Sequence, residues 1–108
     1  MRVLFDQGTP APLRHGLAGH EVTTAHEKGW STLRNGELLA AAEGHFDVLI
    51  TTDQNLRYQQ NLTGRQLAIL ILPTTSWPRL KNATALILAA LHQMQPGSYR
   101  ELPADILR

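Results

Sequence analysis

Two aspartates, each directly after a short apolar segment, are the residues of this chain whose spacing most suggests chemistry. Asp6 follows an apolar run at 2–5, and Asp53 follows a second run at 47–52 that is rich in β-branched residues. Short runs of this kind are typical of buried strands. In an open parallel sheet, ligands bind beyond the carboxyl ends of the strands, where the strand order reverses. The pattern therefore predicts one acidic site at that edge of a parallel sheet.

Two carboxylates at the ends of neighbouring strands point to a divalent cation. Strands in a sheet lie about 4.8 Å apart, and two carboxylates so close repel each other unless a cation neutralises them. Mg²⁺ and Mn²⁺ bind oxygen ligands, need only one or two protein carboxylates, and retain waters that a phosphate can replace. Such an ion polarises a phosphate and lowers the pKa of a bound water. Asp6 and Asp53 thus favour a metal-dependent phosphodiesterase site.

A capping role is the alternative for both aspartates. An aspartate between a strand and a helix commonly caps that helix, and the cap contributes about 1 kcal/mol. The residues alone leave this alternative open. Glu37, in the first turn of a predicted helix, is either a third acid of the site or a favourable charge at the helix N-terminus. Asn55 is either a hydrogen-bonding partner of a metal-bound water or an exposed turn residue.

Strand and helix patterns that alternate along the chain must position these residues. Strands are predicted at 2–5, 21–24, 47–52 and 67–72, with a short edge strand within 98–102. Helices are predicted at 10–17, 25–30, 35–43, 54–62 and 77–94, with Asn35 as the N-cap of the third. The run at 67–72 is apolar throughout, which is typical of a strand covered on both faces. We therefore expect an α/β domain spanning 1–108, a three-layer α/β/α sandwich around a mainly parallel sheet of four to five strands with right-handed crossovers.

Composition narrows the classes of function. A chain of 108 residues is long enough for one domain with a core of its own. It has no cysteine, which excludes disulfides and thiolate metal sites. No apolar run approaches the roughly 20 residues that cross a bilayer, and no secretory signal is recognisable, so we expect a cytoplasmic protein. The net charge of +1 gives no broad basic surface for nucleic acid.

The acidic segments and one helix together resemble a known family. RVLFD at 2–6, NGELLAAA at 35–42 and DVLITTDQNL at 47–56 resemble the PIN-like proteins of the DUF5615 group, small relatives of the PIN-domain nucleases that include VapC-type toxins. The resemblance covers residues 2 to about 95, and the ending T-x-D-x-[DN]-[FL] is its most specific part.

The resemblance implies an activity and a set of site residues. It implies an α/β/α sandwich, Mg²⁺ or Mn²⁺ held by acids at the strand ends, and cleavage of single-stranded RNA by a metal-activated water. By position, Asp6 and Asp53 are similar to the first and the later acid, and Asn55 to the following Asp or Asn. Many relatives have an aspartate where this chain has Asn35, and Glu37, two residues on, is expected to substitute for it.

Two hypotheses follow from the residues and the resemblance together. The leading one is a metal-dependent endoribonuclease, the toxin of a toxin–antitoxin pair, with a cognate antitoxin as partner and a homodimeric state. In it Asp6, Glu37 and Asp53 bind the metal, Asn55 supports them, and two arginines contact the RNA phosphates, namely Arg57 and Arg65. The second hypothesis is a catalytically degenerate PIN-like scaffold that binds a partner protein.

Overall fold

The computed structural model describes residues 1–108 and contains a five-stranded sheet in which all neighbouring strands are parallel. The strand order is β2-β1-β3-β4-β5. The strands are β1 (Arg2–Phe5), β2 (Glu21–Thr24), β3 (Val48–Thr51), β4 (Ala68–Ile71) and β5 (Tyr99–Glu101). The predicted α/β class with a parallel sheet is confirmed, and the C-terminal edge strand is present.

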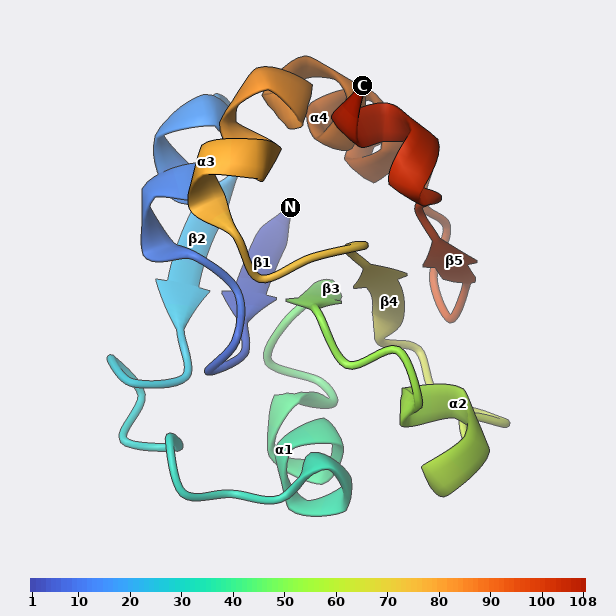
Figure 1. The fold of residues 1–108 in the computed structure, drawn as a ribbon. Coiled ribbons are helices and arrows are strands. Elements are labelled where there is room, and N and C mark those ends of the chain that lie inside the picture. Colours follow the sequence, from blue (N-terminus) through green and yellow to red (C-terminus); the bar gives the residue numbers. More distant parts are fainter.

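Helices lie on both sides of this sheet (Figure 1). The α-helices are α1 (Asn35–Ala42), α2 (Leu56–Gln59), α3 (Trp77–Leu80) and α4 (Thr84–His92). Three short 3₁₀ helices complete the chain: η1 (Ala11–Gly16), η2 (Lys81–Ala83) and η3 (Ala104–Leu107). None of the helices combines the length and the apolar character that a membrane span requires.

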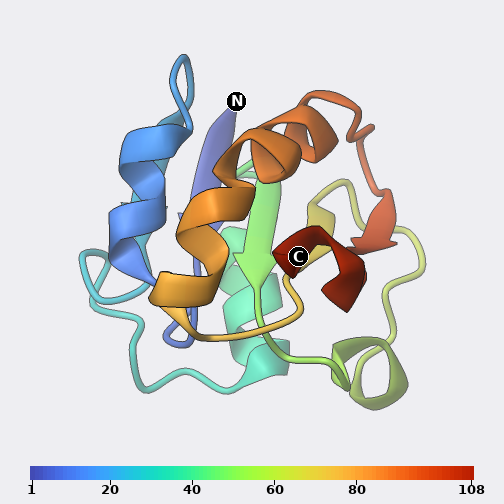
Figure 2. The same ribbon diagram turned by 45° about the horizontal axis from the view of Figure 1, so that its top comes forward.

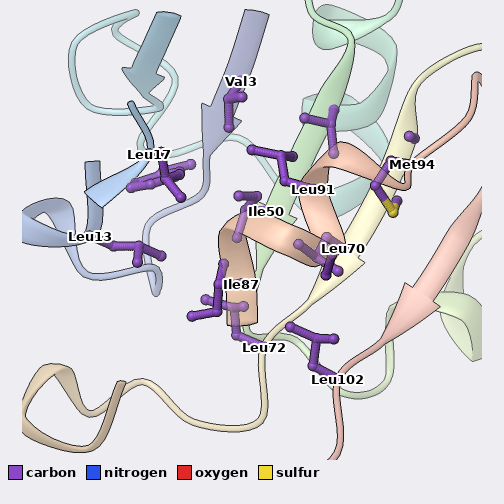
Figure 3. Close-up of a cluster of buried hydrophobic side chains, with 14 of the residues drawn as sticks. Val3, Leu13, Leu17, Ile50, Leu70, Leu72, Ile87, Leu91, Met94 and Leu102 are labelled. Carbon is purple, nitrogen blue, oxygen red and sulfur yellow. The ribbon is translucent and has the colours of Figure 1, made fainter. Parts of the chain in front are cut away.

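Each face of the sheet carries its own apolar core. Because successive strand residues point to opposite faces, Ile50 belongs to the core under η1 and α4, whereas Leu49 belongs to the core under α1 and α2. The first core is the larger, and Figure 3 shows its members converging from strands and helices: Val3, Leu13, Leu17, Ile50, Leu70, Leu72, Ile87, Leu91, Met94 and Leu102. Burial on both faces explains why β4 is apolar throughout and why β3 is apolar up to Thr51, and it fits the expected three layers.

Several predicted helices are shorter than expected or absent. The segment 25–30 forms hydrogen-bonded turns, closed by a bond of 2.8 Å from Trp30 N–H to the Ala25 carbonyl, and Gly29 has φ +76°. The predicted helix 54–62 is reduced to α2, and 10–17 is the 3₁₀ helix η1. The long C-terminal helix is divided by η2 into α3 and α4. Arg34, not Asn35, is the N-cap of α1.

The connection from β4 to β5 does not follow the expected right-handed rule. The chain steps from β3 to β4 through α2 on one face, and it steps in the same direction from β4 to β5 through α3 and α4 on the other face (Figure 1). Two crossover connections that move in the same direction across a parallel sheet, but over its opposite faces, have opposite handedness. The crossover from β4 to β5 therefore has the opposite hand to the three before it, so the right-handed sense expected for all crossovers does not hold throughout.

The strand order reverses direction between β1 and β3. From β1 the chain leaves through η1 toward β2, on the opposite side from β3, whereas from β3 it leaves through α2 toward β4. Figure 2 shows β3 in light green with its arrowhead directed toward the end of the molecule where α2 lies. The carboxyl ends of β1 and β3 therefore form the switch point at which ligands bind in sheets of this order.

Candidate functional site

Asp6 follows β1 at this switch point and is held by two threonines. Its Oδ1 accepts hydrogen bonds from the Thr9 amide at 3.1 Å and the Thr9 hydroxyl at 2.7 Å. Its Oδ2 accepts a hydrogen bond from the Thr51 hydroxyl. Thr9 and Thr51 are buried, while Asp6 itself is half-buried. The carboxylate thus has a fixed orientation at the edge of the sheet.

Asp53 is connected to Asp6 through the same threonine. The Thr51 hydroxyl donates to Asp6 and accepts a hydrogen bond of 3.1 Å from the Asp53 amide. The Asp53 Oδ1 accepts a 2.9 Å bond from the Asn55 amide, and its Oδ2 accepts one from the Asn35 side-chain amide. The two aspartates that the sequence singles out therefore share one hydroxyl as a common neighbour.

Gly8 lies where the loop after β1 approaches the loop after β3. A Cβ on Gly8 would lie 2.6 Å from Thr52 Oγ1 and 4.0 Å from Asp6 Oδ1. The absence of a side chain at Gly8 therefore lets the two loops that carry Asp6 and Asp53 pack together.

Glu37 has a different neighbour from the one expected. Its Oε1 accepts a 3.0 Å hydrogen bond from the Arg34 amide, so the carboxylate caps its own helix, as in a capping box. Asn35, two residues earlier, contacts Asp53 in its place. No group of three or more histidine or acidic side chains is arranged to hold a metal ion.

Both aspartates also accept main-chain N–H groups, as the capping alternative requires. Asp6 accepts from Thr9 and Asp53 from Asn55, each in a turn that follows a strand. Neither carboxylate caps a helix directly, because the N-caps of η1 and α2 are Pro10 and Asn55. Asn55 itself contributes its main-chain amide to Asp53, and its side chain is exposed.

The two predicted phosphate contacts have separate surroundings. Arg57 donates to the Tyr58 hydroxyl at 2.6 Å, and its Nε lies 3.9 Å from Glu101 Oε1. The hydrogen bond to Tyr58 and then the charge of Glu101 raise the pKa of the Arg57 guanidinium above its usual value. Arg57 therefore has partners within the protein, on α2 and β5.

Arg65 lies in the segment that enters β4, at the amino edge of the sheet. The carbonyl of the next residue, Gln66, accepts a 2.7 Å hydrogen bond from the Gly97 amide just before β5. The Arg65 Nε is buried and has no hydrogen-bond partner. The main chain at Arg65 is thus at the edge opposite to Asp6 and Asp53. Asp6 and Asp53 follow their strands, whereas Arg65 precedes β4. In a parallel sheet these positions lie at opposite edges, so the structure does not bring Arg65 next to the two acids.

A cavity of about 370 Å³ opens beside Asp6 at the carboxyl edge. It is lined by residues that follow β1, β2 and β4: Asp6, Gln7, Gly8, Thr9, Pro10, Ala11, Thr24, His26 and Thr75. Thr24, His26 and Thr75 were not among the site residues predicted from the sequence. Each of them ends or follows a strand, as Asp6 does, and this position in the sequence could have singled them out. A second cavity, of about 350 Å³, lies at the amino edge around the ion pair of Arg2 and Asp47.

Comparisons with protein-family models, with curated proteins and with solved structures give no match for this chain.

Proposed function

We propose that the protein is a metal-dependent endoribonuclease that hydrolyses RNA phosphodiester bonds at the carboxyl edge of its sheet. The observation that carries the proposal is the Thr51 hydroxyl, which joins the Asp6 carboxylate to the Asp53 main chain at the switch point. An open cavity of about 370 Å³ adjoins Asp6 and leaves room for a ligand. Convergent polar groups beside a cavity at a switch point are the usual setting of an active site.

The donor set fits a hard divalent cation such as Mg²⁺ or Mn²⁺. An ionised carboxylate has about four lone-pair sites. Asp6 uses three of them in hydrogen bonds to Thr9 and Thr51, and Asp53 uses two in bonds to Asn35 and Asn55. Both carboxylates therefore retain capacity for a cation, with Asp53 the less occupied of the two.

The residues of the chain have separate roles in the proposed reaction. Asp6 and Asp53 would hold the ion, which when bound polarises the phosphate and lowers the pKa of a water. Thr51 fixes the direction of the Asp6 carboxylate. Asn35 orients Asp53 through its amide, and Asn55 fixes the turn that carries Asp53.

The biological setting is proposed from the family resemblance. It comprises a toxin–antitoxin pair with a cognate antitoxin protein, a homodimeric state and a cytoplasmic location. Arg57 remains the predicted RNA phosphate contact, since it is exposed on α2, shortly after Asp53.

A second candidate is a non-catalytic PIN-like scaffold that binds a partner protein. A specific observation favours it: a neutral amide, that of Asn35, occupies the position next to Asp53 where the resemblance expects an acid. Glu37, the expected substitute, is occupied as the cap of α1. A site with only two carboxylates binds a cation more weakly than one with three.

Calorimetric titration with Mn²⁺ separates the two candidates. We expect the wild-type protein to bind Mn²⁺ and Asp53→Asn to bind it at least about tenfold more weakly, a loss of about 1.4 kcal/mol. Asp105→Asn is the matched control, because Asp105 is an exposed acid in η3. Absence of binding to the wild-type protein at millimolar Mn²⁺ would favour the scaffold.

Glu37→Gln tests the third ligand in the same titration. Glutamine retains the oxygen that accepts the Arg34 amide, so the helix cap persists while the charge is lost. Weaker Mn²⁺ binding by this variant assigns Glu37 to the metal, and unchanged binding assigns it to the helix alone.

A further inference from the structure

The cavity at the carboxyl edge contains a second titratable group besides Asp6. Among its lining residues only Asp6 and His26 carry side chains that exchange protons in the ordinary pH range. The two come from neighbouring strands, because β2 pairs with β1 along its whole length and Thr24 is opposite Phe5. Asp6 and His26 therefore lie just beyond adjacent strand ends.

The turn that carries His26 is held by hydrogen bonds on both sides of the residue. The Ala25 amide donates to the Phe5 carbonyl at 2.8 Å, which continues the sheet by one residue, and Ala25 is buried. The Gly29 amide donates to the His26 carbonyl at 3.0 Å, which closes the turn. The position of His26 relative to Asp6 is thus fixed by the main chain.

The neighbouring acid, Glu27, is bound away from the cavity. Its Oε1 accepts hydrogen bonds from Arg14 at 2.7 Å and from the Thr24 amide at 2.8 Å. These bonds, that to Arg14 first, lower the pKa of Glu27 to about 2. The His26 side chain, by contrast, is exposed and makes no hydrogen bond within the chain. Its ring nitrogens are available to a ligand in the cavity.

We propose that His26 is the general acid of this site and protonates the leaving oxygen of the RNA phosphodiester. The inference rests on the proposed endoribonuclease function and deepens it. In the step, a water oxygen forms a bond to phosphorus and gives up a proton to solvent, while the bond from phosphorus to the leaving ribose oxygen breaks. That oxygen takes a proton from the His26 imidazolium, which regains one from solvent. Water and the diester thus give a phosphate monoester and an alcohol.

The strand order supports this division of roles. β1 lies between β2 and β3, so Asp6 stands between His26 on one side and Asp53 on the other. In phosphoryl transfer the attacking and leaving oxygens lie roughly in line on opposite sides of phosphorus. A phosphate beside Asp6 can therefore have its attacking water toward Asp53 and its leaving oxygen toward His26.

Two substrates with different leaving groups test this role. Single-stranded RNA releases an alkoxide that needs a proton, whereas bis(p-nitrophenyl) phosphate releases a nitrophenolate that does not. We expect His26→Gln, assayed with Mn²⁺, to cleave RNA about 100-fold more slowly than wild type, the usual lower bound for general acid catalysis. Its cleavage of the nitrophenyl diester should be unchanged.

A variant of a second histidine, remote from the cavity, serves as the control. His45→Gln replaces an exposed histidine in the turn before β3, at the amino edge, and should cleave both substrates as wild type does. If His26→Gln slows both substrates equally, or slows neither, the general-acid role is overturned while the nuclease function stands. If the wild-type protein cleaves neither substrate in Mn²⁺, the proposed function is overturned and this inference with it. His26→Asn, with its melting temperature, checks that any loss is not a loss of folding.

Discussion

Thr51 is the residue whose side chain contacts both candidate acids. It is buried, 1% exposed, at the last position of β3, and its single hydroxyl serves Asp6 as donor and the Asp53 amide as acceptor. Threonine is a good strand residue because of its branched Cβ. One side chain therefore meets both the requirement of the strand and that of the site.

Replacement of the Thr51 hydroxyl by a methyl group should be costly. Thr51→Val preserves the shape but leaves the amide of the half-buried Asp53 without an acceptor and removes a hydrogen bond to a charged group, so we expect a loss of about 1–3 kcal/mol in the free energy of unfolding. Urea denaturation measures it. Thr52→Val is the control, because the half-buried Thr52 hydroxyl makes no hydrogen bond within the chain. Equal losses in the two variants would contradict the linking role of Thr51.

Asn35→Asp should make folding more dependent on a metal ion. The substitution removes the amide that donates to Asp53 and places a second carboxylate beside it, and two such charges repel each other unless a cation lies between them. We expect a lower melting temperature than wild type in EDTA and a larger upward shift on addition of Mn²⁺.

Asn35→Ala is the matched control for that variant, because it loses the same hydrogen bond without adding a charge. It should be destabilised in EDTA, and its melting temperature should rise no more on addition of Mn²⁺ than that of the wild type does. A Mn²⁺ response of Asn35→Asp no larger than that of wild type would show that this position lies outside any cation site.

The strands of the fold could be predicted from the sequence, whereas the bounds of most helices and the contacts between loops could not. β1, β3 and β4 are short apolar runs, and their parallel pairing places Asp6 and Asp53 at one edge without any knowledge of the loops. The contact of Asn35 with Asp53 depends on the path of the turns at 25–34, which contain no periodic pattern. His26 was missed for a different reason, because its place beside Asp6 follows from the strand order β2-β1-β3, which the residues alone did not predict.

The attachment of the edge strand β5 depends on one glycine. Gly97 has φ +74°, and a Cβ there would lie 2.6 Å from the Arg65 carbonyl oxygen, which belongs to the main chain and has little freedom to move. Gly97→Ala should therefore destabilise the protein by more than the roughly 1–2 kcal/mol of a left-handed alanine alone.

Gly44→Ala provides the matched comparison for Gly97. Gly44 has φ +83° with no atom within 4 Å of the added Cβ, so its replacement tests the backbone strain alone. Chemical denaturation of both variants gives the difference, which we expect to be at least about 1 kcal/mol, the cost of mild overpacking. Equal free energies of unfolding for the two variants would mean that the loop before β5 moves to accommodate the added methyl group at no cost.

At the scale of the whole molecule, two histidines connect the turn before β2 to the end of α4. His20 Nε2 lies 3.0 Å from His92 Nε2, and His20 Nδ1 lies 3.0 Å from the Met1 amino group. Partial burial, then the positive Met1 amino group, then His92 lower the pKa of His20 below 6.5. The folded protein therefore prefers the neutral ring.

The stability of the protein should consequently fall in mild acid. Because the folded pKa of His20 is below the unfolded value of 6.5, its contribution is fully present above that pH and is lost as the pH falls through the folded pKa. Urea midpoints at about pH 7.5 and about pH 5 should differ more for the wild type than for His20→Gln. His15→Gln, which replaces an exposed histidine of η1, should behave as wild type. An identical pH response of wild type and His20→Gln would contradict the role of the pair.

The proposed nuclease function is tested by cleavage of a labelled single-stranded RNA by the wild-type protein and by Asp53→Asn, each in Mn²⁺ and in EDTA. We expect cleavage by the wild type in Mn²⁺ only, and a rate at least about 100-fold lower for Asp53→Asn, since the ion would lose a ligand. Asp105→Asn should cleave as the wild type does. Cleavage that persists in EDTA or in Asp53→Asn, or no cleavage by the wild type, would contradict the assignment of Asp6 and Asp53 to a metal-dependent nuclease site.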